Sequence, residues 1–391
     1  MSEFKSQGRI QSIDLLKGLV MAIMALDHVR DYFHCQAYFF NPVDPTQSPL
    51  PVFFTRWITH FCAPVFCFLA GLSAYMSGRK KSKSALSGFL LKRGLWLLLM
   101  ELTLVTFAWQ FDPQFRINGL AVIGTLGISM IFLAGLIHLP KTVILIFCSL
   151  IILGHNLLDK IQLPGNFLWS IIHHAEVFTF SDSFKFYVDY PIIPWIAVMP
   201  LGYWFGSFYN NNVDSSKRKR LFTIIGISAV CSFVLIRWLN FYGDPLPWTK
   251  LDSGSKTLMS FLNLNKYPPS LLYLLVTLGA ALIFLGNTEN LKGKLVNFFT
   301  TFGRVPFFYY LLHLYIIHLL AALFAQLSGF GWKLLVLPDW ILETPTLKGY
   351  GFNLAIVYLV WLSVIAINYP LCKWYDKYKN NHREKWWLSY L

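Results

Sequence analysis

The stretch "SIDLLKGLVMAIMALDHVRDYF", residues 12 to 33, is long and apolar enough to cross a membrane as a helix. It nevertheless carries a series of ionisable side chains, namely Asp14, Lys17, Asp27, His28, Arg30 and Asp31. Such side chains are costly in lipid, so in membrane proteins they face the interior of a helix bundle or a water-filled cavity. The stretch therefore predicts a helix bundle with a polar interior.

The composition of the whole chain is that of an integral membrane protein. Of the 391 residues, 55% are hydrophobic and only 13% are charged, against about 25% in soluble domains. The formal net charge is +14, but Lys and Arg lie in short clusters between apolar runs, which is typical of topology signals. We therefore expect no nucleic acid partner. The six cysteines lack the spacing of metal ligands, so we expect no bound metal.

Apolar runs of about 20 residues, the length of a transmembrane helix, recur along the chain. We expect about ten, at residues 13–33, 53–77, 86–108, 119–138, 141–159, 187–209, 219–240, 267–286, 301–327 and 351–374. Most Lys and Arg residues lie in connections on the side of the two termini. The sequence thus predicts an all-α, polytopic transmembrane helix bundle with both termini cytoplasmic, in the inner (cytoplasmic) membrane of the cell.

The weakest boundary is "HLPKT", residues 138 to 142. If the two apolar runs beside it formed a single helix, "KRKR", residues 217 to 220, would lie on the outer side. That placement conflicts with the excess of Lys and Arg that cytoplasmic connections carry. We expect one membrane domain over residues 1–391, with a cytoplasmic tail at 1–10 and an interfacial cytoplasmic tail at 375–391. Long outer connections are expected at 34–52, 160–186, 241–266 and 328–350, and connections of this length often bind ligands.

Helix geometry places the ionisable residues in two layers. Lys17 and His28 are eleven residues apart, so they share one face of the first helix about 16 Å apart, with Asp14 one turn below Lys17. Three residues on other expected helices reach the depth of His28, and they are His60, Glu101 and His313. Near the depth of Lys17 lie the cations Lys92, Arg93 and Arg304.

Each layer also has a purely structural explanation. A histidine such as His60 can serve as an interhelical hydrogen-bonding residue. The cations Arg93 and Arg304 can be anchors at the membrane surface. We include Asp27 among the candidate catalytic residues because it precedes His28, but with Arg30 and Asp31 it can equally form an ion-pair cap at the helix end.

The two layers together suit a particular chemistry. Cations at a cytoplasmic mouth bind phosphates, and a deeper histidine can remove a proton from an attacking hydroxyl or amine. A long, flexible acyl thioester fits this arrangement. A proton-coupled transporter would use the same kinds of residue in a pore. A non-catalytic partner in an envelope-synthesis complex, binding through the long outer loops, is a third alternative.

Several motifs resemble the bacterial branch of the heparan-alpha-glucosaminide N-acetyltransferase catalytic-domain family. They run from Arg9 to the C-terminal "WWLSYL" and comprise "RIQSIDLLKGLVMAIMALDHVRDYF", "TRWITHFCAPVFCFLAG", "KRGLWLLLMEL", "YPIIPWIAVMPLGYWFG", "FYGDPLPW", "KYPPSLLYLLVTLG" and "GRVPFFYYLLHL". The wider set of multi-pass membrane acyltransferases carries a basic residue, ten intervening residues and a histidine on the first helix. Lys17 and His28 match that pattern.

The resemblance implies acetyl-CoA as co-substrate on the cytoplasmic side and an acceptor, a sugar or envelope component, on the other. It implies His28 as general base and Lys17 in the donor path. Their depth or their place on the first helix adds Arg93, Arg304 and Asp14 as donor-side candidates. His313 and Glu101 are then candidates for orienting the base. Membrane lipid and a second copy of the chain remain open as partners. Since no Ser or Cys lies beside His28 in the sequence, we expect direct transfer, with an acetyl-histidine intermediate as the alternative.

Overall fold

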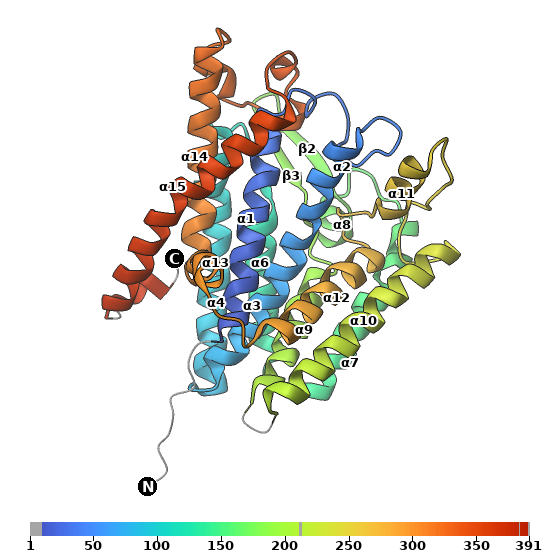
Figure 1. The fold of residues 1–391 in the computed structure, drawn as a ribbon, viewed down its shortest axis with the longest axis vertical. Helices are drawn as coiled ribbons and strands as arrows, with labels where there is room; N and C mark the ends of the chain where they lie inside the picture. Colours follow the sequence, from blue (N-terminus) through green and yellow to red (C-terminus); the bar gives the residue numbers. More distant parts are fainter. Residues whose placement is uncertain (1–9, 211–212, 383, 390–391) are drawn as a thin grey trace.

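A computed structural model describes residues 10–210, 213–382 and 384–389. About 70% of the chain is helical. Helix α1 (Gln11–Phe33) runs through the middle of the bundle, and Figure 1 shows the remaining long helices arranged around it. Helices α3, α12, α13, α14 and α15 all contact α1. The stretch with the most ionisable residues thus lies inside the bundle.

The other helices of the first half are α2 (Leu50–Trp57), α3 (Cys62–Gly78), α4 (Lys83–Met100), α5 (Thr106–Gln110), α6 (Val122–Leu136), α7 (Lys141–Gly154), α8 (Phe167–His173) and α9 (Trp195–Gly206). Those of the second half are α10 (Ser215–Leu239), α11 (Gly254–Leu262), α12 (Leu271–Thr288), α13 (Lys294–Arg304), α14 (Pro306–Leu327) and α15 (Leu354–Asn381). Short 3-10 segments are η1 (Ile58–Phe61), η3 (His155–Lys160), η4 (Ser207–Tyr209), η5 (Trp332–Leu335), η6 (Ile341–Glu343), η7 (Pro345–Leu347) and η8 (Trp386–Ser389), and η2 (Glu101–Val105) is a π-helical turn.

Local sequence signals set many of these helix ends. The side chains of Ser82, Asp214 and Asn353 each accept a hydrogen bond from a backbone N–H in the first turn of the helix that follows. Pro306 is the first residue of α14 and separates it from α13, because proline has no N–H to continue a helix from the preceding turn. The run expected at 301–327 is therefore two helices.

Much of the expected helical pattern is confirmed. Within the described residues, six helices are long and apolar enough to cross a membrane, and they are Leu50–Gly78, Lys141–Lys160, Ser215–Leu239, Leu271–Thr288, Pro306–Leu327 and Leu354–Asn381. The weak boundary near "HLPKT" is real, because α6 ends at Leu136 and α7 begins at Lys141. Ten spans and cytoplasmic termini stay predictions.

The expectation of an all-α fold is wrong in one region. A three-stranded sheet of order β1-β3-β2 contains β1 (Ile117–Leu120), which is parallel to β3 (Phe184–Val188), and β2 (Glu176–Ser181), which is antiparallel to β3. The spans expected from 119 and 187 therefore begin in strands. Alternating aromatic residues in "FKFYV" favour a strand, and Pro191 and Pro194 delay the start of α9.

The C-terminal helix also extends beyond its expected end. Helix α15 continues to Asn381, so the first part of the tail expected at 375–391 is helical. Residues 1–9, nearly all of the N-terminal tail expected at 1–10, lie outside the described residues.

Glycines allow α13 to lie directly on α1. A Cβ atom at Gly18 of α1 would lie 1.7 Å from the carbonyl oxygen of Phe299, and one at Gly303 of α13 would lie 1.9 Å from that of Asp14. No other residue fits at such a separation, and small residues are the usual means by which membrane helices approach closely. This contact fixes the Lys17 end of α1.

Candidate active site

Two cavities lie along α1, one near each end. The Lys17 cavity has a volume of about 310 Å³ and is lined by Lys17 and Met24 of α1 and by parts of α3, α4, α6 and α14. The His28 cavity has a volume of about 590 Å³ and is lined by Asp27 and His28 of α1 and by several long connections. Among the described lining residues, the two cavities share only Val122 and Tyr310.

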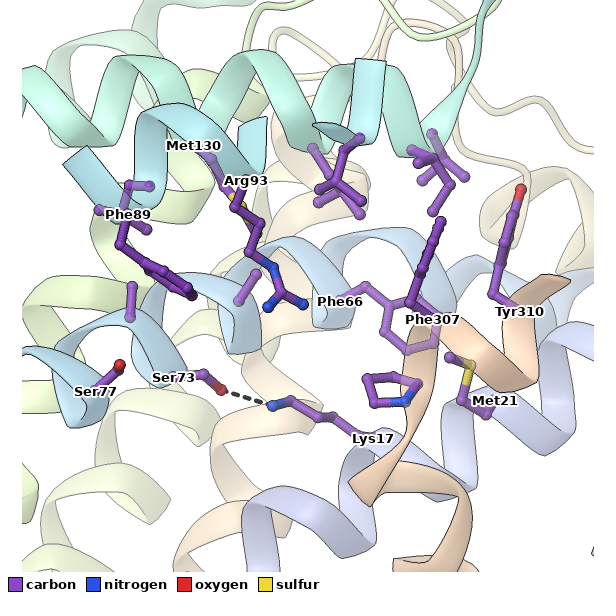
Figure 2. Close-up of a pocket in the computed structure, with 18 of the residues that line it drawn as sticks. Lys17, Met21, Phe66, Ser73, Ser77, Phe89, Arg93, Met130, Phe307 and Tyr310 are labelled. Carbon is purple, nitrogen blue, oxygen red and sulfur yellow. Dashed lines mark hydrogen bonds between the residues drawn. The ribbon is translucent and has the colours of Figure 1, made fainter. Parts of the chain in front are cut away.

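The Lys17 cavity combines an apolar wall with two cations. The Lys17 ammonium donates a hydrogen bond to Ser73 Oγ over 2.6 Å. Figure 2 shows Arg93 of α4 reaching into the same cavity, while Phe89, Phe66 and Phe307 line it. No Asp or Glu occurs among the described residues that line this cavity. The cavity is therefore suited to an anion with an apolar chain.

In the His28 cavity, α1 and α14 bring two histidines together. His28 Nδ1 lies 2.8 Å from His313 Nε2, and His313 Nδ1 lies 2.9 Å from the carbonyl oxygen of Tyr309. A carbonyl oxygen only accepts, so His313 Nδ1 carries the proton and, in the neutral ring, Nε2 is an acceptor. His28 Nδ1–H then donates to it. The lone pair of the neutral His28 ring is thereby left on Nε2.

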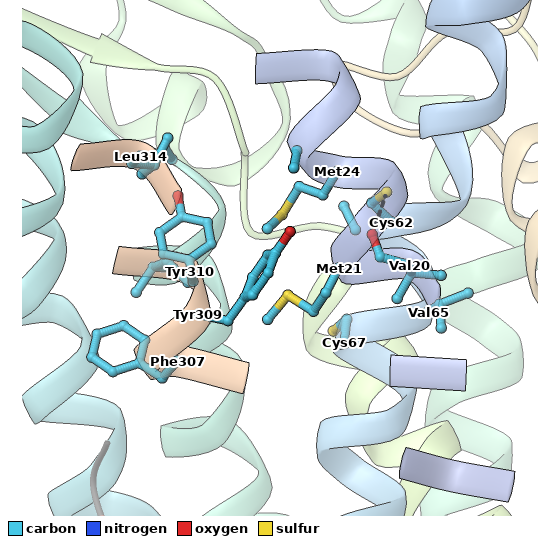
Figure 3. Close-up of a cluster of buried hydrophobic side chains, with 14 of the residues drawn as sticks. Val20, Met21, Met24, Cys62, Val65, Cys67, Phe307, Tyr309, Tyr310 and Leu314 are labelled. Carbon is cyan, nitrogen blue, oxygen red and sulfur yellow. Dashed lines mark hydrogen bonds between the residues drawn. The ribbon is translucent and has the colours of Figure 1, made fainter. Parts of the chain in front are cut away.

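Part of the wall around His28 is aromatic. The ring of Trp109, at the end of α5, lies edge-on to His28 with 4.7 Å between ring centroids. Figure 3 shows Met21 and Met24 of α1 facing Tyr309 of α14 within the hydrophobic core. Met21, Met24 and Tyr310 also line the Lys17 cavity, so α1 and α14 pack against each other along its wall.

A cluster of ion pairs surrounds the carboxylate next to His28. Asp27 accepts from Arg30 over 3.1 Å, pairs with Arg56 of α2, and lies 4.0 Å from Lys266 Nζ. Arg30 also donates to Asp31 over 2.6 Å. The ion pair expected of Asp27, Arg30 and Asp31 is therefore confirmed. Its extension to Arg56 and Lys266 connects α1 to α2 and to a distant loop.

Two further carboxyl groups line the His28 cavity from outside the helices. Asp189 follows β3, and Glu343 ends the short η6 segment. Burial raises the pKa of the Asp189 carboxyl to about 7, the nearby Glu343 carboxylate adds to the rise, and Lys266 opposes it. The charge of this wall therefore changes near neutral pH.

The structure brings some of the predicted residues to these cavities. Lys17 and Arg93 share one cavity, and Asp27, His28 and His60 line the other. The His60 ring lies 5.3 Å from that of Tyr273. His313 is fully buried and reaches the site through its contact with His28.

Besides His313, three predicted residues line neither cavity. Glu101 is buried, and its Oε2 accepts from the backbone N–H of Gly124 over 2.7 Å, at the start of α6. Asp14 is buried on α1 beside α13. Arg304 is partly exposed and pairs with Asp376 of α15 over 3.3 Å.

Most residues that line the His28 cavity stand outside the predicted site, among them Arg56, Trp109, Lys266 and Tyr310. Two of these four had a usable sequence signal. Arg56 precedes His60 by four residues, and Tyr310 precedes His313 by three, spacings that place each pair on one side of a helix. Lys266 lies in an irregular loop, where no periodicity indicates its neighbours.

The fold and the two cavities define a helical membrane protein whose bundle encloses a polar site at each end of one helix. A family model described as heparan-alpha-glucosaminide N-acetyltransferase, catalytic, matches residues 9–241. The chain belongs to this family, which is one of membrane acetyltransferases. No curated protein matches the chain.

The family match confirms the resemblance from Arg9 onward over more than half of the chain. It includes Lys17, His28 and Arg93. Tyr310 and His313 lie beyond residue 241, so the resemblance at their positions stays a prediction.

Proposed function

We propose that the protein transfers an acetyl group from acetyl-CoA to a hydroxyl or amine of an acceptor. The donor occupies the Lys17 cavity from the cytoplasmic side, and the acceptor, a sugar or another envelope component, enters the His28 cavity from the outer side of the inner membrane. The observation that carries the proposal is that two chemically different cavities adjoin at Tyr310. One is lined by His28, which contacts His313, and the other by Lys17 and Arg93 with no Asp or Glu among its described lining residues.

The Lys17 cavity has the features that a CoA thioester requires. Lys17 and Arg93 would bind its phosphates by charge-assisted hydrogen bonds, and the apolar wall would hold the pantetheine arm. The thioester end would then lie toward Val122 and Tyr310, where the His28 cavity begins. Family membership supports acetyl as the group that is transferred.

His28 Nε2 would act as the general base. It takes the proton from the acceptor nitrogen or oxygen as that atom attacks the thioester carbonyl carbon. The new C–N or C–O bond forms, the C–S bond breaks, and the proton passes from His28 to the CoA sulfur. His313 would hold His28 in the required tautomer through the 2.8 Å contact.

The test uses purified protein in detergent, wild type beside His28→Ala. Both should bind acetyl-CoA, and slow thioester loss should fall by about 10²- to 10⁴-fold in the variant, as expected when a general base is removed. Thermal unfolding of both proteins controls for folding. If neither folded protein binds acetyl-CoA, the proposal fails and the proton-coupled transporter becomes the leading alternative.

A further inference from the structure

We infer that the Tyr310 hydroxyl donates a hydrogen bond to the thioester carbonyl oxygen and so stabilises the negative charge that develops there during transfer. This inference rests on the proposed function and adds a second catalytic residue to it. It assigns a role to a side chain that the sequence did not single out.

The position of Tyr310 is the first argument. Only Val122 and Tyr310 line both cavities among the described residues, and of these two only Tyr310 has a polar side chain. Figure 2 shows Tyr310 at the end of the Lys17 cavity opposite Phe89 and Ser77. A thioester that extends from one cavity toward the other must pass this hydroxyl.

The hydrogen-bonding state of Tyr310 is the second argument. Trp109 and Tyr310 line the His28 cavity together. An indole nitrogen only donates, so Trp109 cannot accept the hydrogen of the Tyr310 hydroxyl. No acceptor for that hydrogen is found among the described residues, although Tyr310 is only 3% exposed.

The hydroxyls of Tyr32 and Tyr273 differ in this respect, whereas those of four further described tyrosines, Tyr309 among them, are also buried without a hydrogen-bond partner. The hydroxyl of Tyr32 donates to the carbonyl oxygen of Trp109 over 2.6 Å, and that of Tyr273 donates to the carbonyl of His60 over 2.6 Å. Buried polar groups normally have such partners, because an unmade hydrogen bond costs about 1–3 kcal/mol. A buried donor at the junction of two cavities therefore points to a ligand acceptor.

The geometry places this donor beside the base. Tyr310 is three residues before His313 on α14, the centroids of their rings are 5.6 Å apart, and Trp109 lies edge-on to the His28 ring. As the acceptor attacks the carbonyl carbon, the electron pair of the C=O bond moves to oxygen, where Tyr310 O–H stabilises it without giving up its proton. When the C–S bond breaks, the carbonyl re-forms and His28 protonates the sulfur.

Infrared spectroscopy of bound acetyl-CoA labelled with ¹³C at the carbonyl tests this inference without any acceptor. His28→Ala would be compared with the double variant His28→Ala/Tyr310→Phe, so that no turnover occurs. In the first protein the carbonyl band should lie below its frequency in solution, since a hydrogen bond weakens the C=O bond. In the second it should return toward the solution value, because phenylalanine keeps the ring and removes the donor.

Kinetics gives the second readout. Tyr310→Phe alone should reduce thioester loss by about 10²- to 10³-fold, the usual effect of removing one oxyanion donor, with acetyl-CoA affinity unchanged. Tyr315→Phe is the matched control, because Tyr315 lies on the same helix, lines neither cavity and donates to Leu104 O. Bound acetyl-CoA with the same carbonyl band in both proteins overturns the inference. Absence of acetyl-CoA binding overturns the proposed function instead.

Discussion

The two cavities along α1 differ in the charges of the residues that line them. The described lining of the Lys17 cavity has two cations and no carboxylate, whereas the His28 cavity has more charges of both signs, with Asp27 in contact with Arg30, Arg56 and Lys266. A lining of one sign suits a charged ligand, while a balanced buried cluster holds protein segments in place. Position on one helix thus says little about what a charged residue does.

The largest effect should come from breaking the balanced cluster. Asp27→Asn leaves three cations without their shared carboxylate, and removing one member of a buried ion pair costs about 3–5 kcal/mol. We expect a loss of that size in the free energy of unfolding, measured by denaturation in detergent. Asp182→Asn, on the exposed turn between β2 and β3, is the control. Equal stability of the two variants would contradict the structural role of the cluster.

The next largest effect should come from the histidine pair. His313→Leu removes the acceptor that fixes the His28 tautomer, and the loss of such a hydrogen bond corresponds to a decrease of about 10- to 100-fold in the rate of thioester loss. His313→Gln keeps an amide oxygen that can accept from His28 Nδ1–H, so it should retain more of the rate. A pH–rate profile for each variant separates this effect from a change in folding. If Leu and Gln act alike, His313 does not orient the base.

A smaller change is expected at the Lys17 cavity. Arg93→Ala should weaken acetyl-CoA binding by about 10-fold with little change in unfolding free energy, because one charge-assisted contact to the ligand is lost. Lys92→Ala is a close control, since Lys92 is the preceding residue, is exposed and lines neither cavity. Titration calorimetry of both variants measures the difference. Similar affinities would show that net charge at this surface, not the cavity, binds the donor.

The last prediction concerns pH and the wall of the His28 cavity. Burial raises the pKa of Asp189 to about 7 from an ordinary value of 3.8, so the folded state holds this proton more tightly than the unfolded state. The stability that it contributes is complete below about pH 4 and is lost as pH rises toward 7. Relative to Asp189→Asn, the wild type should therefore become less stable over this window and change no further above it. Parallel pH dependence of the two melting temperatures would contradict this.

The sequence predicted the site residues on regular helices better than it predicted the ion-pair partners of Asp27. Lys17, Arg93, His28 and His313 were accessible because they lie on regular helices, where rise and rotation per residue convert spacing into depth. Lys266 was missed because a loop brings it to Asp27, and helix geometry does not describe that path. The spacing of Arg56 to His60 indicated a shared helix face but not the ion pair of Arg56 with Asp27.

The three-stranded sheet shows a related limit of prediction from the sequence. Its strands lie in segments that were assigned to the ends of two membrane spans, at Ile117–Leu120 and Phe184–Val188, because short apolar runs fit a strand or a helix equally well. Glu101 illustrates the same difficulty for side chains. Its depth was calculated from a straight helix, but a π-helical turn begins at Glu101 and its carboxylate is directed to α6.

The junction between the cavities has a consequence for permeability. In the proposed function, donor and acceptor reach the two cavities from opposite faces of a membrane, and an open path between them would let ions and water dissipate any gradient. Among the described lining residues the cavities share only Val122 and Tyr310, and Met21, Met24 and Tyr309 belong with Tyr310 to the hydrophobic core. A junction this narrow would let a small acyl group pass without an aqueous path for ions.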